Sequence, residues 1–175
     1  MSAQLKQLIS DTQSTFSANP DAAKATFKSS SRLTEGFRSE VSIRQHKFAV
    51  DEPPALGGAD SAPTPVELIL AALGTCQEIT YRAYATAMGI PLDAVSVELT
   101  GDLDLRGFFA VDDSVRSGYQ HIRGTVKLES SAGEAELQKL REMVDAHCPV
   151  LDILTNKVPV SMSLSINSPS SPKTV

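Results

Sequence analysis

The chain has 175 residues and a mass of 18.7 kDa, which corresponds to one domain with room for a terminal extension, and its 41% hydrophobic and 21% charged residues are typical of globular proteins. Its 16 Lys and Arg against 21 Asp and Glu give a formal charge of −5, which excludes the basic field of a non-specific nucleic-acid binder. No apolar run reaches the roughly 18 residues of a membrane helix, and the first residues lack the apolar core of a signal peptide, so we expect a cytoplasmic protein with no membrane partner.

The first segment is predicted to be a short amphipathic helix. Apolar residues recur at spacings of three and four between Leu5 and Phe16, and Asn19-Pro20 ends the pattern. We therefore interpret residues 1–23 as an N-terminal helical extension.

Three strands are predicted next, because the apolar period changes to two. One run begins at Phe27, a second follows the Glu35-Gly36 turn over residues 37–44, and a third covers residues 46–50. Residues 51–63 carry Pro, Gly and Asp so densely that they are predicted to form a loop.

A long helix is predicted to start at Thr64, with Pro65 at its first position and Glu67 closing a capping box. It runs to about Met88, and its first half, LILAALG, is apolar on every side. A helix of that kind is buried in the middle of a domain. One chain has too few other elements to cover it, so the sequence predicts a homodimer.

The rest of the chain is predicted to form three half-buried strands and a helical pair. Alternating apolar residues mark strands over 95–100, 122–128 and 160–166. A helix over 134–146 and a short helical turn over 149–154 lie between the last two strands.

The two cysteines are the candidate reactive groups. Cys76 lies on the buried part of the long helix, where a cysteine is most often a small core hydrophobe whose thiol burial silences. Cys148 precedes Pro149 and is placed at a helix N-cap, where free N–H groups lower the pKa of a thiol. His147 beside it is interpreted as a surface residue.

A metal site is not predicted, and neither is a cofactor. Such a site would combine Cys76 and Cys148 with one of the three histidines, His46, His121 or His147. No C-x-x-C or H-x-x-x-H spacing is present, and thiolate chemistry needs no metal.

Two motifs resemble those of the OsmC/Ohr family. Residues 63–76 (PTPVELILAALGTC) are similar to its central-helix motif, and residues 147–150 (HCPV) to its second cysteine motif. The resemblance implies an α+β fold over residues 24–167, with two antiparallel-rich sheets around long central helices in an intertwined homodimer. The polar, Pro-broken end, 168–175, is predicted to be disordered.

The resemblance also implies thiol peroxidase chemistry. An organic hydroperoxide oxidises Cys76 to a sulfenic acid, and Cys148 resolves it by condensing to a disulfide. The implied reductant is a dithiol such as a lipoyl group.

One departure separates the chain from the dedicated organic hydroperoxide resistance branch. That branch has a catalytic Glu directly after the motif proline, where this chain has Val66. Glu67, one residue later, is the candidate for this catalytic role, but it lies on the opposite side of the helix from Cys76 and roughly 13 Å along it, which favours a capping role. The chain therefore resembles the broad OsmC-like group.

The branch's catalytic arginine has three candidates here, Arg32, Arg38 and Arg44. Arg32 precedes the hairpin turn and fits the family's position best, although each arginine taken alone is more often a solvated charge.

Three questions stay open: which thiol is attacked, what the segment 104–109 does, and whether the protein is an enzyme. The N-cap argument favours Cys148 as the more acidic thiol, whereas the resemblance favours Cys76 as the thiol that is attacked. Either assignment requires Cα atoms within about 7 Å if a bridge is to form. The segment DLRGFF (104–109) is either a lid in which Phe108 and Phe109 form an apolar wall, or its aromatics are ordinary core or dimer-interface residues. A non-catalytic OsmC-like stress or ligand-binding protein is the alternative function, favoured by Val66.

Overall fold

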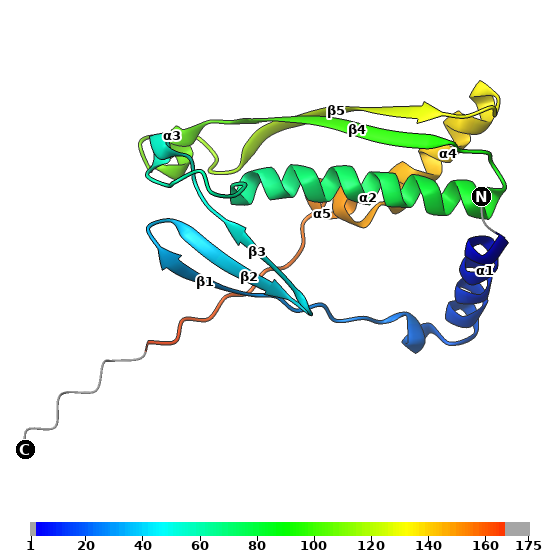
Figure 1. The fold of residues 1–175 in the computed structure, drawn as a ribbon, viewed down its shortest axis with the longest axis horizontal. Coiled ribbons are helices and arrows are strands. Elements are labelled where there is room, and N and C mark those ends of the chain that lie inside the picture. The colour runs from blue at the N-terminus through cyan, green and yellow to red at the C-terminus, as the bar shows by residue number, and fades with distance from the viewer. Residues whose placement is uncertain (1–2, 167–175) are drawn as a thin grey trace, which may run out of the picture.

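The computed structural model describes residues 3–166 and shows an α+β arrangement of two antiparallel sheets and five α-helices (Figure 1). In chain order the elements are α1 (Ala3–Ala18), η1 (Pro20–Ala23), β1 (Ser30–Glu35), β2 (Arg38–Ile43), β3 (His46–Val50), η2 (Pro54–Leu56), α2 (Pro65–Met88), β4 (Ala94–Leu103), α3 (Leu105–Phe108), β5 (Tyr119–Glu129), α4 (Glu134–His147) and α5 (Pro149–Thr155). The fold class predicted from the sequence is confirmed.

The first sheet has the order β1-β2-β3, as the alternating pattern predicted. Gly36 has a positive φ of 55° in the turn between β1 and β2, a conformation that favours glycine. The first strand starts at Ser30, so Phe27 lies outside it and is exposed. All of β1 is exposed, and within residues 3–166 no helix packs extensively on this sheet.

The second sheet is the long β4–β5 hairpin, which lies along α2 (Figure 1). Val97 pairs with Val126, and Leu99 pairs with Gly124. A Cβ at Gly124 would lie 2.6 Å from the Glu98 carbonyl oxygen, so this close strand contact requires glycine.

The ends of α2 follow the sequence signals. The Thr64 hydroxyl accepts a hydrogen bond from the Glu67 N–H at 3.3 Å, and the Glu67 carboxylate accepts one from the Thr64 N–H at 2.8 Å. At the other end Gly89 adopts a left-handed conformation with φ 73°, which terminates the helix.

The core lies between the C-terminal half of α2, the hairpin and α4. Its buried members are Tyr81, Ala85, Ile90, Leu92, Leu140 and Val144. Helix α4 therefore holds α2 against the sheet, and α5 continues from it toward the middle of α2.

Truncation of the core at Leu140 is expected to destabilise the fold strongly. Leu140 is 0% exposed, so Leu140→Ala removes buried methyl groups and leaves a cavity. We expect a loss of about 2–5 kcal/mol in the free energy of unfolding, measured by urea denaturation. Leu105→Ala, at an exposed site, serves as the control and should change stability by less than about 0.5 kcal/mol.

The first half of α2 is not buried on all sides within one chain. Ile69 is 42% and Ile79 70% exposed, although Leu73 and Gly74 are buried against the hairpin. One chain therefore leaves this face of α2 uncovered, as expected from a sequence with too few other elements to cover the helix, and its burial against a second copy stays a prediction.

The strand predicted over residues 160–166 does not form. The segment has no regular secondary structure, and its alternating apolar side chains are exposed, from 78% at Val160 to 90% at Met162. A strand needs a partner for its hydrogen bonds, and among residues 3–166 no strand pairs with this segment.

The two ends of the chain were predicted to lie outside the OsmC-like domain. Helix α1 forms as predicted and contacts α2. The tail predicted to be disordered, 168–175, lies outside the described residues. Among residues 3–166, no helix combines the length and hydropathy needed to cross a membrane.

Candidate functional site

The two cysteine thiols lie next to each other. Cys76 is halfway along α2, and Cys148 is at the junction where α4 ends and α5 begins. The sulfur atoms are 3.3 Å apart although 72 positions separate the residues, and both thiols are free. A disulfide is about 2.05 Å long, so the sulfurs need to approach by only about 1.2 Å to form one.

The environments of the two thiols differ. Cys148 is 1% exposed, whereas Cys76 is half-buried. Burial is the largest cause that raises the pKa of the Cys148 thiol, and the Cys76 sulfur beside it adds to the rise. The backbone N–H groups of Leu151 and Val150 at the start of α5 oppose this shift and lower the pKa of the thiol. The N-cap argument that made Cys148 the acidic thiol is therefore wrong in its net direction, because burial outweighs the helix N–H groups.

The two sulfurs interact directly through a hydrogen bond. The Cys148 thiol donates to Cys76 Sγ, so Cys148 holds its proton toward its neighbour. Cys76 Sγ thus accepts a hydrogen bond and is also the more exposed sulfur of the pair.

The surface of α2 around Cys76 is apolar and open. Ile69, Ala72 and Ile79 share a helix face with Cys76 at offsets of seven, four and three, and all three are exposed. This α2 stripe, defined as Ile69, Ala72, Cys76 and Ile79, gives an apolar molecule access to one sulfur of the pair.

The candidate arginines lie in the first sheet, away from the thiols. Arg32 is in β1, Arg38 starts β2 and Arg44 follows β2 with a φ of 54°. Within the described part of the chain, none of them forms a hydrogen bond or ion pair with Cys76 or Cys148. One chain alone does not bring a guanidinium to the sulfur pair.

Arg38 is nevertheless held firmly in place. Its Nη1 donates to Ser61 Oγ at 2.6 Å, and Ser61 Oγ donates to Asp51 Oδ2 at 2.7 Å. Asp51 also accepts from the N–H groups of Glu52, Ala59 and Ser61. Asp51 is 1% exposed, and these donors, the Ser61 hydroxyl first, lower its pKa from 3.8 to about 2.

Asp51→Asn is expected to destabilise the protein in a pH-dependent way. The folded pKa of Asp51 is about 2, below its unfolded value, so its ionisation stabilises the fold above the unfolded pKa, and this contribution fades as the pH falls toward 2. Thermal unfolding from pH 7 to pH 2 should show a lower midpoint for the variant at pH 7 and converging midpoints near pH 2. Asp113→Asn, at an exposed site, should follow the wild type. A constant offset at every pH would contradict the assignment.

Glu67 is engaged as the cap of α2. Its Oε2 accepts from both the backbone N–H and the hydroxyl of Thr64, at 2.8 and 3.0 Å. Val66, at the place of the family's catalytic glutamate, uses its carbonyl oxygen to accept the Tyr119 hydroxyl at 2.9 Å. The start of α2 is thus tied to β5 rather than to the thiols.

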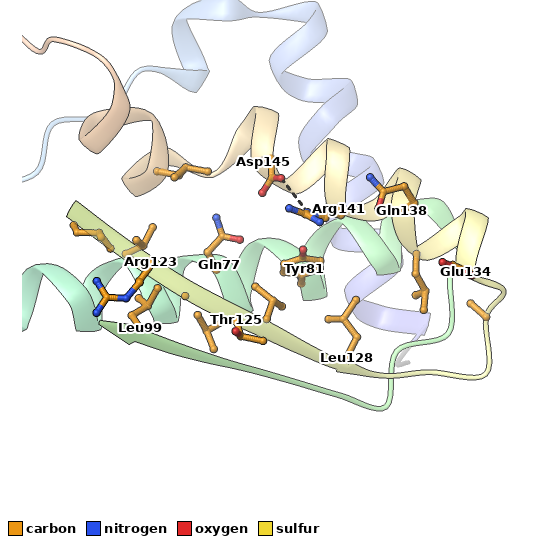
Figure 2. Close-up of a pocket in the computed structure, with 18 residues that line it drawn as sticks. Gln77, Tyr81, Leu99, Arg123, Thr125, Leu128, Glu134, Gln138, Arg141 and Asp145 are labelled. Atoms are coloured by element: carbon orange, nitrogen blue, oxygen red, sulfur yellow. Dashed lines mark ion pairs between the residues drawn. The ribbon is translucent and has the colours of Figure 1, made fainter. Parts of the chain in front are cut away.

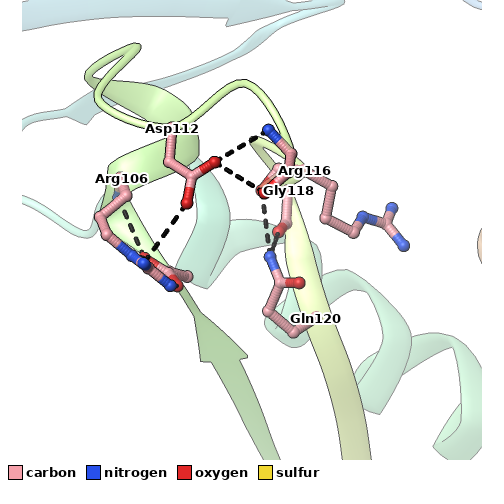
Figure 3. Close-up of polar contacts among 7 residues, drawn as sticks. Arg106, Asp112, Arg116, Gly118 and Gln120 are labelled. Carbon is pink, nitrogen blue, oxygen red and sulfur yellow. Dashed lines mark hydrogen bonds and ion pairs between the residues drawn. The ribbon is translucent and has the colours of Figure 1, made fainter.

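The segment after β4 is a rigid, internally bonded loop (Figure 3). The Arg106 guanidinium pairs with Asp104 at 2.6 Å and with Asp112 at 3.5 Å. Asp112 also accepts from the N–H and hydroxyl of Ser114, and the Gln120 side chain donates to two backbone carbonyls of the loop. The Arg106 hydrogen bonds lower the pKa of Asp104.

This loop displays two aromatic side chains. Phe108 and Phe109 are 65% and 54% exposed, with ring centroids 5.0 Å apart in an edge-to-face pair. Phe108 and Phe109 are therefore not core residues of the single chain, whereas a place in a lid or at a dimer interface stays a prediction.

Within residues 3–166, no histidine forms a hydrogen bond with either cysteine side chain. His147 is exposed, as predicted, and its ring stacks on Tyr84 with centroids 5.4 Å apart. Within residues 3–166, no three His, Cys, Asp or Glu side chains are grouped so as to hold a metal ion.

A family model described as OsmC-like protein matches residues 58–163, which is more than half of the chain. The chain belongs to the OsmC-like family. The matched region contains both cysteines and all of α2, the hairpin, α4 and α5. No curated protein matches the OsmC-like chain.

Solved structures agree on the fold. An OsmC-like protein from Mycoplasma pneumoniae superposes with a TM-score of 0.66 at 18% identity, over 75% of this chain and 89% of that one. An organic hydroperoxide resistance protein OsmC from Legionella pneumophila gives 0.58 at 20% identity, covering 74% and 89%. One from Elizabethkingia anophelis gives 0.57 at 17% identity, covering 74% and 87%. At these identities the likeness shows the OsmC-like fold.

Sequence reasoning missed Asp51 and Ser61. Both lie in the segment predicted only as a loop. Their mutual hydrogen bond joins positions ten residues apart, and Ser61 in turn accepts a hydrogen bond from Arg38 on β2. An Asp directly after a strand and before a Pro- and Gly-rich loop was the available signal, since Asp side chains commonly accept nearby N–H groups.

Proposed function

We propose that this OsmC-like protein is a thiol peroxidase that reduces organic hydroperoxides and takes part in defence against oxidative stress. The 3.3 Å separation of the Cys76 and Cys148 sulfurs carries the proposal. Membership of the OsmC-like family and the fold shared with proteins described as organic hydroperoxide resistance proteins support it.

In the first step the Cys76 thiolate attacks the outer oxygen of the hydroperoxide. An S–O bond forms, the O–O bond breaks, and the alkoxide takes a proton and leaves as the alcohol, so Cys76 becomes a sulfenic acid. Cys76 is assigned this role because it is the more accessible sulfur and receives the hydrogen bond of Cys148.

In the second step the Cys148 sulfur attacks the Cys76 sulfenic sulfur. The S–S bond forms, the S–O bond breaks, and the hydroxyl leaves with the Cys148 proton as water. An external dithiol, for which a lipoyl group is the candidate, then reduces the disulfide and is itself oxidised to a cyclic disulfide. We place this cycle in the cytoplasm, where such dithiols are kept reduced.

We propose further that the working form is an intertwined homodimer. The α2 stripe is exposed, the β1–β3 sheet lacks a covering helix, and residues 158–166 lack a strand partner. A second copy would bury the stripe, cover the sheet and pair with the unpaired segment. It would also bring an arginine of its first sheet to the thiols. Arg32 and Arg38 are the candidates, and Glu67 is left as a cap.

Titration of free thiols tests the proposal. The reduced protein is mixed with one equivalent of cumene hydroperoxide, and the remaining thiols are measured with Ellman's reagent. We expect both thiols to disappear within the mixing time, whereas cumyl alcohol leaves both unchanged. Chelator in the buffer should make no difference.

A non-catalytic stress or ligand-binding protein is the alternative. Val66 at the place of the family's glutamate favours it, as does the finding that within residues 3–166 no candidate arginine hydrogen-bonds either sulfur. Retention of both thiols in the same titration would establish this alternative and reject the peroxidase.

A further inference from the structure

A cavity of about 770 Å³ lies between the inner face of the β4–β5 hairpin and helices α2, α4 and α5 (Figure 2). Its volume is in the range of small-molecule sites, which is about 300–1,000 Å³. About half of the wall is apolar and is formed chiefly by Leu73, Val97, Leu99, Ile122, Val126 and Leu128, and the rest is polar. Neither cysteine lines it, so it is a separate compartment from the thiol pair.

Two buried polar side chains of α2 face this cavity. Gln77 is 6% and Tyr81 2% exposed, and they lie one helical turn apart on the same face. Figure 2 shows the Gln77 amide standing in the cavity between α2 and α4. Neither side chain has a hydrogen-bond partner within residues 3–166, and no fully enclosed polar atom there is unsatisfied. Their polar atoms are therefore open to the cavity itself.

Polar groups without a protein partner on the wall of a cavity can hydrogen-bond a molecule that binds there. A ligand that displaces water from Gln77 and Tyr81 must supply these hydrogen bonds itself, or it leaves the two groups unsatisfied. Burial, and next the Asp145 carboxylate, raise the pKa of Tyr81, so its hydroxyl stays a donor at neutral pH.

The charges around the cavity offer no free cation. Arg141 pairs with Asp145 at 3.5 Å, as the dashed line in Figure 2 shows, and Arg123 pairs with Asp102. The only other charged group of the lining is Glu134. A carboxylate at Gln77 and Tyr81 would lose its hydration without gaining a counter-ion, which is unfavourable.

We propose that this cavity binds a neutral, mostly apolar molecule with one hydroxyl or carbonyl head group, which Gln77 and Tyr81 hold by hydrogen bonds. The apolar body lies along the hairpin side chains, and the head group points at α2. The site stands independently of the proposed peroxidase. Leu151 lines the cavity, and its backbone N–H lies close enough to the Cys148 sulfur to lower the pKa of that thiol.

A displacement assay with the full chain tests this site. N-phenyl-1-naphthylamine, a dye that fluoresces in apolar cavities, serves as reporter, and 1-decanol and decanoate at pH 8 serve as competitors. We expect 1-decanol to displace the dye at a concentration at least about tenfold lower than decanoate, because only the neutral head group avoids the cost of burying a charge.

Matched variants locate the binding. Gln77→Leu and Tyr81→Phe should each raise the 1-decanol concentration needed by roughly 2- to 12-fold, the value of one hydrogen bond, while the dye itself still binds. Val97→Trp, which fills the cavity, should abolish dye binding. Lys139→Gln on the exposed side of α4 should bind the dye and 1-decanol like the wild type. The double variant Cys76→Ser/Cys148→Ser, which removes the proposed peroxidase thiols, should also keep dye and 1-decanol binding.

Four results would overturn the proposal. The first is that the dye does not bind the wild type, which is expected if a segment of a second copy fills the cavity. The second is that decanoate competes as well as 1-decanol, and the third is that both Tyr81→Phe and Gln77→Leu bind 1-decanol like the wild type. Because Tyr81→Phe removes a single hydroxyl, it keeps the test valid if the other variants fail to fold. Binding that disappears only in the cysteine double variant would assign the dye to the thiol site instead.

Discussion

Cys76→Ser is expected to lose the fast reaction with cumene hydroperoxide, whereas Cys148→Ser should react once and then stop. The reason is the asymmetry of the pair: Cys76 is the accessible sulfur and receives a hydrogen bond, while Cys148 is 1% exposed and its pKa is raised by burial. The stalled Cys148→Ser protein should carry a sulfenic acid on Cys76, which dimedone labels and excess peroxide over-oxidises. Stopped-flow peroxide consumption and mass spectrometry measure both effects.

The reverse pattern would exchange the two roles. If Cys148→Ser loses the fast step and Cys76→Ser keeps it, the helix N–H groups at Cys148 control its reactivity in spite of burial. If neither variant differs from the wild type, the cysteines do not react and the chain is a binding protein. Thr75→Ser, a conservative change beside Cys76 on α2, is the matched control and should react like the wild type.

Ile79→Asp is expected to convert a dimer into monomers. Ile79 is 70% exposed in the single chain and belongs to the α2 stripe, so an aspartate there is solvated in a monomer but would be desolvated against a second copy. Sedimentation equilibrium should give twice 18.7 kDa for the wild type and 18.7 kDa for the variant at the same micromolar concentration. If an arginine comes from the second copy, the variant should also react slowly with peroxide.

Lys139→Gln, on the exposed face of α4, controls for a general effect of changing surface charge and should stay dimeric. A wild-type mass of 18.7 kDa would show that the protein is a monomer and would contradict the proposed dimer. Circular dichroism of Ile79→Asp separates dissociation from unfolding.

Local sequence signals predicted most of the elements. Thr64, Pro65 and Glu67 defined the start of α2, and Gly36 marked the β1–β2 turn, because capping and positive φ act within a few residues. The two cysteine motifs identified the family, and the distance between the sulfurs in the fold agrees with a bridging pair.

Features that depend on distant contacts were not predictable in the same way. Alternation over residues 160–166 indicated a strand, but no strand of the chain pairs with it. The N-cap position of Cys148 indicated a low pKa, but burial reverses the direction. The hydrogen bonds that join Asp51, Ser61 and Arg38 depend on the folded positions of distant segments. In the sequence Gln77 and Tyr81 are ordinary helix residues, and only the packing of the hairpin and α4 places them at a cavity.

The most direct test of the central claim is the covalent state of the sulfurs after one equivalent of organic hydroperoxide. Intact-mass and peptide-map spectrometry of the wild type should show the loss of two hydrogen atoms and one bridge between Cys76 and Cys148 of the same chain. An external dithiol should restore the original mass. An unchanged mass, or a bridge that joins two different chains, would contradict the account.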